Sequence, residues 1–199
     1  AMTTAVTNLY GERGYLVASA YVGAQTMAGG TLTVTVVEGR FSRIVVRSNK
    51  TEVSDAQILR TLAENLCRKH GDCKGVGPVR TRDVERAGLI VSEIPGVEAT
   101  YEMKAGDEPG STSLFLDAAR APRFSVTVAG DNTGFEYTGA NRGTLGFSVN
   151  NLLNRGDQTT LSTTYSGKGL FSFALDSSLP VGYRGARAGV SAALLRYAL

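Results

Sequence analysis

The sequence contains no tryptophan, one histidine and two cysteines, and it has no long uninterrupted apolar run. Because a membrane-spanning helix needs roughly 18 or more consecutive apolar residues, we expect no such helix. The single histidine, His70, lies in a polar loop between the cysteines and reads as a solvated residue, whereas a Ser/His/Asp or Cys/His catalytic site would need it well positioned. No phosphate-binding glycine motif is present. The sequence therefore does not favour an enzyme, and we expect no cofactor.

The net charge is also small, at +3, and the basic residues are spread along the chain. A nucleic-acid-binding protein usually concentrates its basic residues on one element, so we expect no nucleic-acid partner. Glycine is abundant, with 24 residues, and apolar residues make up 42% of the chain. These values favour a folded protein that is rich in turns and β structure.

The two cysteines, Cys67 and Cys73, flank His70 in the stretch NLCRKHGDCKG. Their short spacing suits a disulfide that closes a small loop in an oxidising compartment. Two free thiols remain the alternative. The three side chains together are fewer than a structural zinc site takes, so we expect no metal.

The first part of the chain predicts a repeated order of elements. Residues 41–118 read as strand, helix, helix, strand, strand, and residues 2–38 read as helix, strand, strand. The shorter stretch therefore has the last three elements of the longer one, which indicates an internal repeat. We expect the longer stretch to have a core of its own, formed by Ile44, Val46, Ile58, Leu62, Leu66, Val84, Val91, Ile94 and Phe115.

The second part of the chain has no helical period. Five stretches, the last one less regular, alternate apolar residues with small or polar ones: 124–130, 144–150, 160–167, 171–179 and 187–199. This alternation is typical of outer-membrane strands, and equally of a half-exposed soluble sheet. On the membrane interpretation the lipid-facing residues are Phe124, Val126, Val128, Leu145, Phe147, Val149, Phe171, Phe173 and Leu175. Since a membrane barrel needs at least about 8 strands, these strands would be the beginning of one.

Several stretches, in order, resemble one family. LYGERGYLVASAYVGAQTMAGGTLTVTVVEGRFSRIVV is similar to the end of a POTRA domain of the haemolysin-secretion type. LRTLAENL and VRTRDVERAGLIVSEIPGVEATYEM are similar to a second POTRA domain. GDNTGFEYTGANRGTLGFSVNNLLNRGDQTTLSTTYS and LDSSLPVGYRGARAGVSAALLRYAL resemble the first barrel hairpins of the same proteins. The family is the TpsB outer-membrane transporters of two-partner secretion, within the Omp85 superfamily.

The resemblance implies α+β POTRA domains, of order β-α-α-β-β, followed by the first antiparallel strands of a transmembrane β-barrel. The implied divisions are the end of a first POTRA domain at 1–40, a second at 41–119, and barrel strands at 120–199. It further implies a Gram-negative outer membrane, with the POTRA domains in the periplasm. The implied partners are an unfolded secreted protein and, for the strands, membrane lipid. The family's plug helix and its later barrel strands have no counterpart in this sequence.

The resemblance also places the second strand of each POTRA domain at a sheet edge. These edges are residues 15–22 and 97–104, and an exposed edge accepts an extended peptide through main-chain hydrogen bonds. The alternative is an edge protected by charge, from Glu98, Glu102 and Lys104. The expected peptide-binding residues are Tyr15, Val17, Ser19, Tyr21, Val97, Ala99, Tyr101 and Met103.

Two other functions stay open at this point. An Omp85-type factor that assembles other outer-membrane proteins would share this architecture, although the stretch from Gly14 to Gly39 favours the haemolysin-secretion type. A soluble β-rich binding or adhesion protein would share the alternating strands. It predicts that residues 124–199 fold in water without detergent.

Overall fold

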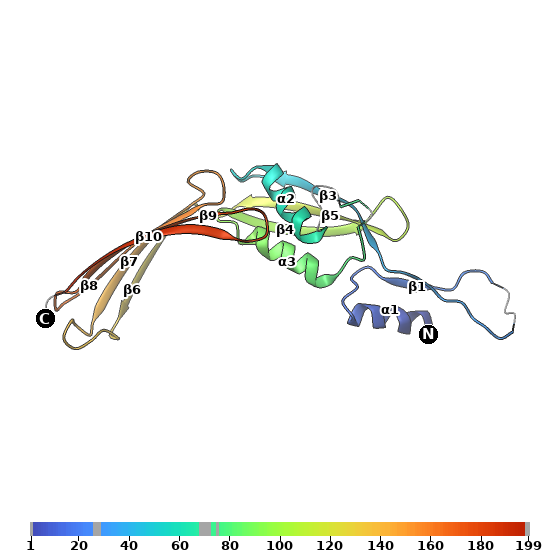
Figure 1. Cartoon of the computed structure of the whole chain (residues 1–199), viewed down its shortest axis with the longest axis horizontal. Coiled ribbons are helices and arrows are strands. Elements are labelled where there is room, and N and C mark those ends of the chain that lie inside the picture. The colour runs from blue at the N-terminus through green and yellow to red at the C-terminus, as the bar shows by residue number, and fades with distance from the viewer. Residues whose placement is uncertain (1, 26–28, 68–72, 75, 198–199) are drawn as a thin grey trace. The chain divides into compact units, whose positions relative to one another are not determined.

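A computed structural model of the chain describes residues 2–25, 29–67, 73–74 and 76–197 (Figure 1). His70 lies outside the described residues. The chain forms two compact units. The first comprises Ala1–Asn49, Asp55–Val91 and Ala99–Ala118, and the second comprises Lys50–Ser54, Ser92–Glu98 and Ala119–Leu199.

The first part of the chain contains helices and strands in the predicted order. The elements are α1 (Met2–Glu12), β1 (Ser19–Tyr21), β2 (Thr35–Val37), β3 (Arg40–Asn49), α2 (Asp55–Leu66), α3 (Thr81–Ser92), β4 (Val97–Ala105) and β5 (Ser111–Arg120). The strand-helix-helix-strand-strand order of residues 41–118 is therefore confirmed. Among the described residues, no helix has the length and apolar content needed to cross a membrane.

The strands β3, β5 and β4 form one sheet in that order, with β3 parallel to β5. Helices α2 and α3 lie across one face of this sheet (Figure 1). Both helices begin with an acidic residue in the first turn, Asp55 and Asp83, which the positive end of a helix dipole favours. The buried apolar side chains of this unit are Phe41, Ile58, Leu62, Ala63, Leu66, Val79, Ala87, Val91, Leu114, Leu116 and Ala118.

Of the nine expected core residues, five are buried, whereas Ile44, Val46, Val84 and Phe115 are only half buried. The expectation fails most clearly at Phe115, because its two neighbours are the buried residues. Leu114 and Leu116 are buried, whereas Phe115 is only half buried. Arg43 and Lys104 place their cationic groups 5.9 and 5.7 Å from the centre of its ring. Because successive side chains of a strand point to opposite faces, a core position for Leu114 and Leu116 turns Phe115 to the face away from the helices.

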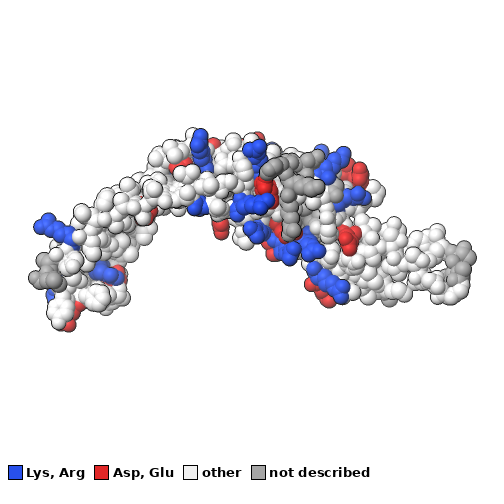
Figure 2. All heavy atoms as spheres, in the orientation of Figure 1, with Lys and Arg blue, Asp and Glu red and all other residues white. Residues whose placement is uncertain are grey.

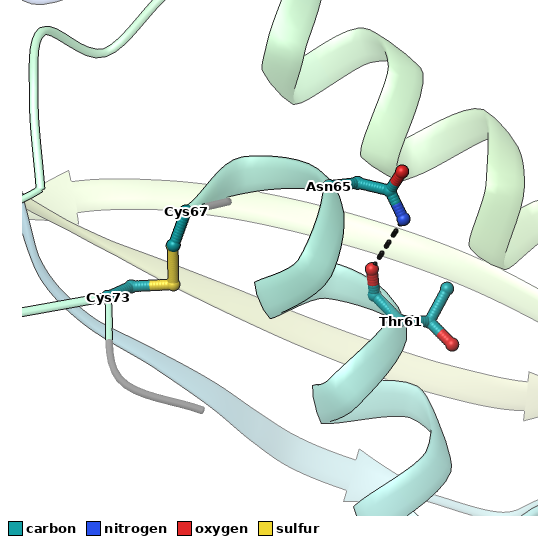
Figure 3. The surroundings of a disulfide bond; sticks show 4 residues. All are labelled: Thr61, Asn65, Cys67 and Cys73. Carbon is teal, nitrogen blue, oxygen red and sulfur yellow. Dashed lines mark hydrogen bonds between the residues drawn. A yellow bond between two sulfur atoms is a disulfide. The ribbon is translucent and has the colours of Figure 1, made fainter. Parts of the chain in front are cut away.

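The disulfide joins Cys67, which follows α2, to Cys73, and their Cα atoms are 5.3 Å apart (Figure 3). Both cysteines are buried. The chain after Cys73 is fixed to β3, because the Phe41 amide donates to the Val76 carbonyl at 2.9 Å. The bond therefore ties the end of α2 to the segment that leads towards α3.

The second unit is dominated by an antiparallel sheet of five strands. They are β6 (Phe124–Asp131), β7 (Arg142–Asn150), β8 (Gln158–Ser166), β9 (Phe171–Pro180) and β10 (Arg187–Arg196). Each strand pairs with the next along the chain, so the sheet is a simple meander (Figure 1). The five predicted strands are all present, with bounds that differ by a few residues.

The core positions give a test of residues 41–118 as a folding segment. We expect residues 41–118, expressed alone, to unfold cooperatively in urea. Leu116→Ala should lower the free energy of unfolding by about 2–5 kcal/mol, because it leaves a cavity in the buried layer. Phe115→Ala is the matched control and should cost clearly less, since its ring is partly exposed. Equal losses, or a disordered product, would contradict this core.

The disulfide gives a second test. Unfolded, unreduced protein from an oxidising compartment should contain no titratable thiol. Reduction should lower the free energy of unfolding by about 2–3 kcal/mol, because a loop this short restrains the unfolded chain only modestly. A variant with Cys67→Ser and Cys73→Ser should not respond to reductant. Two free thiols in the unreduced protein would refute the bond.

Candidate functional site: a strand edge and a two-sided sheet

Strand β4 lies at one end of the three-stranded sheet, and among the described residues no strand pairs with its outer side. The Gly106 amide donates to the Ser111 carbonyl at 2.9 Å, where β4 turns back into β5. Backbone groups of alternate residues in a strand point to the same side. The even-numbered residues of β4 therefore direct their amides towards β5. The odd-numbered residues, which include Ala99, Tyr101 and Met103, direct their backbone groups to the outer side of the sheet.

The side chains of β4 alternate between the two faces of the sheet. Ala99, Tyr101 and Met103 are half buried, and the Tyr101 hydroxyl donates to the Gly88 carbonyl of α3 at 2.9 Å. Tyr101 therefore ties β4 to α3, and the groups of these residues that are directed outward are those of the backbone.

Charged residues of β4 lie on the open face of the sheet. Glu102 accepts from Lys104 at 3.1 Å and from Arg47 of β3 at 2.8 Å. Arg47 also pairs with Asp117 of β5. Hydrogen bonds from Lys104, first, and from Arg47 lower the pKa of the Glu102 carboxyl. Of the charges that the sequence suggested as edge protection, Glu102 and Lys104 therefore pair with each other along β4, and Glu102 also pairs with Arg47 of β3.

The other expected edge, residues 15–22, is shorter than predicted. Only Ser19–Tyr21 is regular strand, paired with β2. Tyr15 instead forms an isolated bridge with Arg80, and the Leu16 amide donates to the Val79 carbonyl at 3.0 Å. Val17 packs against Gly39, which has a φ of 78° and leaves no space for a Cβ. This segment is thus pinned to the chain before α3, which shortens the strand.

An amide of β1 also has an intramolecular partner. The Ala20 amide donates to the Thr7 hydroxyl of α1 at 3.0 Å. The edge at β1 is therefore three residues long with one amide already bonded, whereas β4 offers a nine-residue strand. Of the two expected edges, β4 is the longer and more regular one.

The five-stranded sheet separates its two faces by register. In one row of cross-strand partners, Val126, Phe147, Leu161, Leu175 and Ala192 follow one another across all five strands. Residues directly opposite in an antiparallel pair point to the same face. All nine residues expected to face lipid lie on this face, which we call the apolar face. Leu161, Val190 and Leu194 share this face and follow the same period of two, although they were not among the residues expected to face lipid.

The opposite face, called the hydroxyl face, is formed mainly by small and hydroxyl side chains. One row across the strands is Ser125, Ser148, Thr160, Asp176 and Ser191. Some of these hydroxyls bond to each other across strands, as Ser148 does with Thr160 at 3.0 Å. Leu195 departs from this pattern, because its partner in the register is Ser172.

Most charged groups of the strands lie near the strand ends, and the exception, Asp176, is in the middle of β9 on the hydroxyl face. Asp131 and Arg142 close the β6–β7 connection with an ion pair at 2.8 Å, and Arg187 begins β10. In Figure 2 much of the surface of this sheet is white between its charged ends. The sheet therefore has an apolar band bounded by polar ends.

Comparison with known proteins agrees with this arrangement. Residues 1–39 match the family of POTRA domains of the ShlB type. The chain is 31% identical over 196 residues to the heme/hemopexin transporter protein HuxB of Haemophilus influenzae, covering 98% of this chain and 33% of HuxB. The chain thus spans about a third of that relative's length.

Solved structures give the same match. CdiB from Escherichia coli superposes with a TM-score of 0.65 and 25% identity, over 97% of this chain and 38% of CdiB. BamA from Haemophilus ducreyi, lacking POTRA domains 1–3, superposes with a TM-score of 0.55 and 14% identity, over 98% of this chain and 36% of BamA. The second likeness concerns the fold alone. This chain is therefore related, over nearly its whole length, to the TpsB outer-membrane transporters of two-partner secretion, within the Omp85 superfamily.

Proposed function

We propose that the chain is the POTRA region and the first barrel strands of an outer-membrane protein that exports a secreted partner. The division that we propose is the end of a first POTRA domain at 1–40, a second POTRA domain at 41–119 and barrel strands at 120–199. The POTRA domains lie in the periplasm and the strands in the outer membrane. The role is transport, and no catalytic step is part of it.

The observation that carries this proposal is the register of the five-stranded sheet. A row of large apolar side chains on one face, with hydroxyl and small side chains on the other, suits a strand between lipid and a watery lumen. The strands are eight to ten residues long, close to the roughly 9–11 that span a bilayer. The similarity to HuxB and CdiB supports the same interpretation.

The outer side of β4 is the proposed site of partner capture. An unfolded polypeptide can add to this edge as a further strand, with its amides and carbonyls bonded to outward backbone groups such as those of Ala99 and Met103. Backbone pairing is tolerant of sequence, which suits a partner recognised before it folds. Folding of the partner outside the cell then makes its return unfavourable, without a need for ATP.

An assembly factor of the BamA kind is the second candidate. The likeness to BamA is at 14% identity, against 31% for HuxB and 25% for CdiB. The ShlB-type match at residues 1–39 also favours export over assembly. A neighbouring reading frame for a large, repeat-rich secreted protein would support export, and a barrel-assembly operon would support the alternative.

The two faces of β7 give a test of the membrane assignment. Phe147→Arg in the full-length protein should block barrel assembly, because an arginine at the lipid midplane costs roughly 2–4 kcal/mol. Ser148→Arg, one residue along on the hydroxyl face, should be tolerated better. Assembly is judged by heat-modifiable mobility on gels. Equal tolerance at both positions would return residues 124–199 to a soluble sheet.

The β4 edge gives a separate test of capture. Met103→Pro removes an outward amide, and an edge strand tolerates proline there. We expect it to weaken binding of an unfolded partner segment about tenfold, equivalent to about 1.4 kcal/mol, while Met103→Ala, which keeps the amide, leaves binding near normal. Binding is measured by titration with a labelled segment. Equal affinities for the two variants would exclude this edge as the site.

A further inference from the structure

The turn between β7 and β8, residues 151–157, is held by its own polar side chains. Asp157 is 3% exposed, and its carboxylate accepts the amides of Leu152 at 3.0 Å and Leu153 at 2.9 Å. Asn151 is 2% exposed, and its side-chain oxygen accepts the Gly156 amide at 2.8 Å. Two buried polar side chains therefore satisfy three of the turn's backbone amides, which fixes its shape.

The backbone of this turn is also specialised. Asn151 and Asn154 have φ angles of 57° and 58°, and that of Gly156 is 75°. Asparagine tolerates this left-handed region better than other residues with a Cβ. A Cβ on Gly156 would lie 2.6 Å from the Ile94 Cγ2 atom, so the turn rests closely on that side chain. The inner side of the turn is thus packed and rigid.

The outer side of the same turn presents two leucines. Leu152 is 53% exposed and Leu153 is 63% exposed, and Arg155 follows them on the exposed side. The next connection at this end of the sheet, between β9 and β10, adds exposed Val181 and the arginine Arg184. The arrangement combines apolar side chains with cationic ones at one end of the strands.

The length of the neighbouring strands indicates the environment of the β7–β8 turn. β7 and β8 are nine residues each, about the length that spans a bilayer when tilted. A turn that directly follows such a strand lies at the level of the lipid headgroups. Apolar side chains next to an arginine suit that level. There the alkyl groups reach the acyl boundary, and the guanidinium groups reach the phosphates.

We propose that residues 151–157 form a rigid lipid-interface anchor, in which Leu152 and Leu153 enter the boundary between headgroups and acyl chains of a phospholipid leaflet. Arg155 lies on the phosphate side of this boundary. Asp157 and Asn151 are positioning residues, since they hold the backbone that presents the leucines. This inference rests on the proposed membrane location of the strands.

The test uses the full-length protein with Leu153→Cys, labelled with an environment-sensitive nitrobenzoxadiazole, in vesicles of phosphatidylcholine and phosphatidylglycerol. Cys67 and Cys73 are bonded to each other, so the label goes to the introduced thiol. Lipids with a nitroxide high on the acyl chain should quench the label at least about twofold more than lipids with a deep nitroxide. Leu152→Cys serves as a second position if the first variant assembles poorly.

Two reference labels separate the possible failures. A label at Phe147→Cys, on the apolar face, should prefer the deep nitroxide, and one at Ser148→Cys, on the hydroxyl face, should not be quenched by lipid. Quenching at 147 without quenching at 152 or 153 would overturn the anchor and leave the proposed function standing. A turn label shielded from both lipid nitroxides and aqueous iodide would show a protein surface there, and would also overturn it. No quenching at 147 would sink the membrane assignment itself.

Discussion

The pairing of backbone groups in the five-stranded sheet is the constraint on which the rest of this structure depends. In a bilayer each amide and carbonyl needs a partner within the protein, so the strands pair in one unbroken register. That register puts Phe147, Leu161 and Leu175 in one row and Ser148, Thr160 and Asp176 in the next. A slip of one residue would exchange the two faces, so the alternation of side chains and the backbone pairing enforce each other.

The need of backbone groups for partners has a different consequence at β4. Its inner side is paired with β5, while its outer side has backbone groups without a strand partner among the described residues. In water such an edge is tolerated, and beside it Glu102 pairs with Lys104 along β4 and with Arg47 of β3. The proposed function uses this difference, since a strand edge can be left open in the periplasm and must be closed in the membrane.

Connections in this chain are fixed by local chemistry more than by large cores. The Cys67–Cys73 bond and the Phe41–Val76 hydrogen bond hold the chain between α2 and α3. The β7–β8 turn is held by the buried carboxylate of Asp157 and the amide of Asn151. In both places a few bonds to backbone amides or between sulfurs replace the packing that a short segment cannot supply.

The sequence alone determined the element order, the five strands and most of the apolar face, because periods of 3.6 and 2 are local properties. It did not determine that Phe115 turns away from the helices or that β1 is only three residues long. Phe115 turns away because its neighbours take the buried positions. Strand β1 is short because Tyr15 and Leu16 pair with Arg80 and Val79, which are far away in the sequence. The supports of the β7–β8 turn were hidden for the same reason. Asp157 and Gly156 look like ordinary turn residues in the sequence, and only the fold shows the carboxylate bonded to the turn's amides and Gly156 against Ile94.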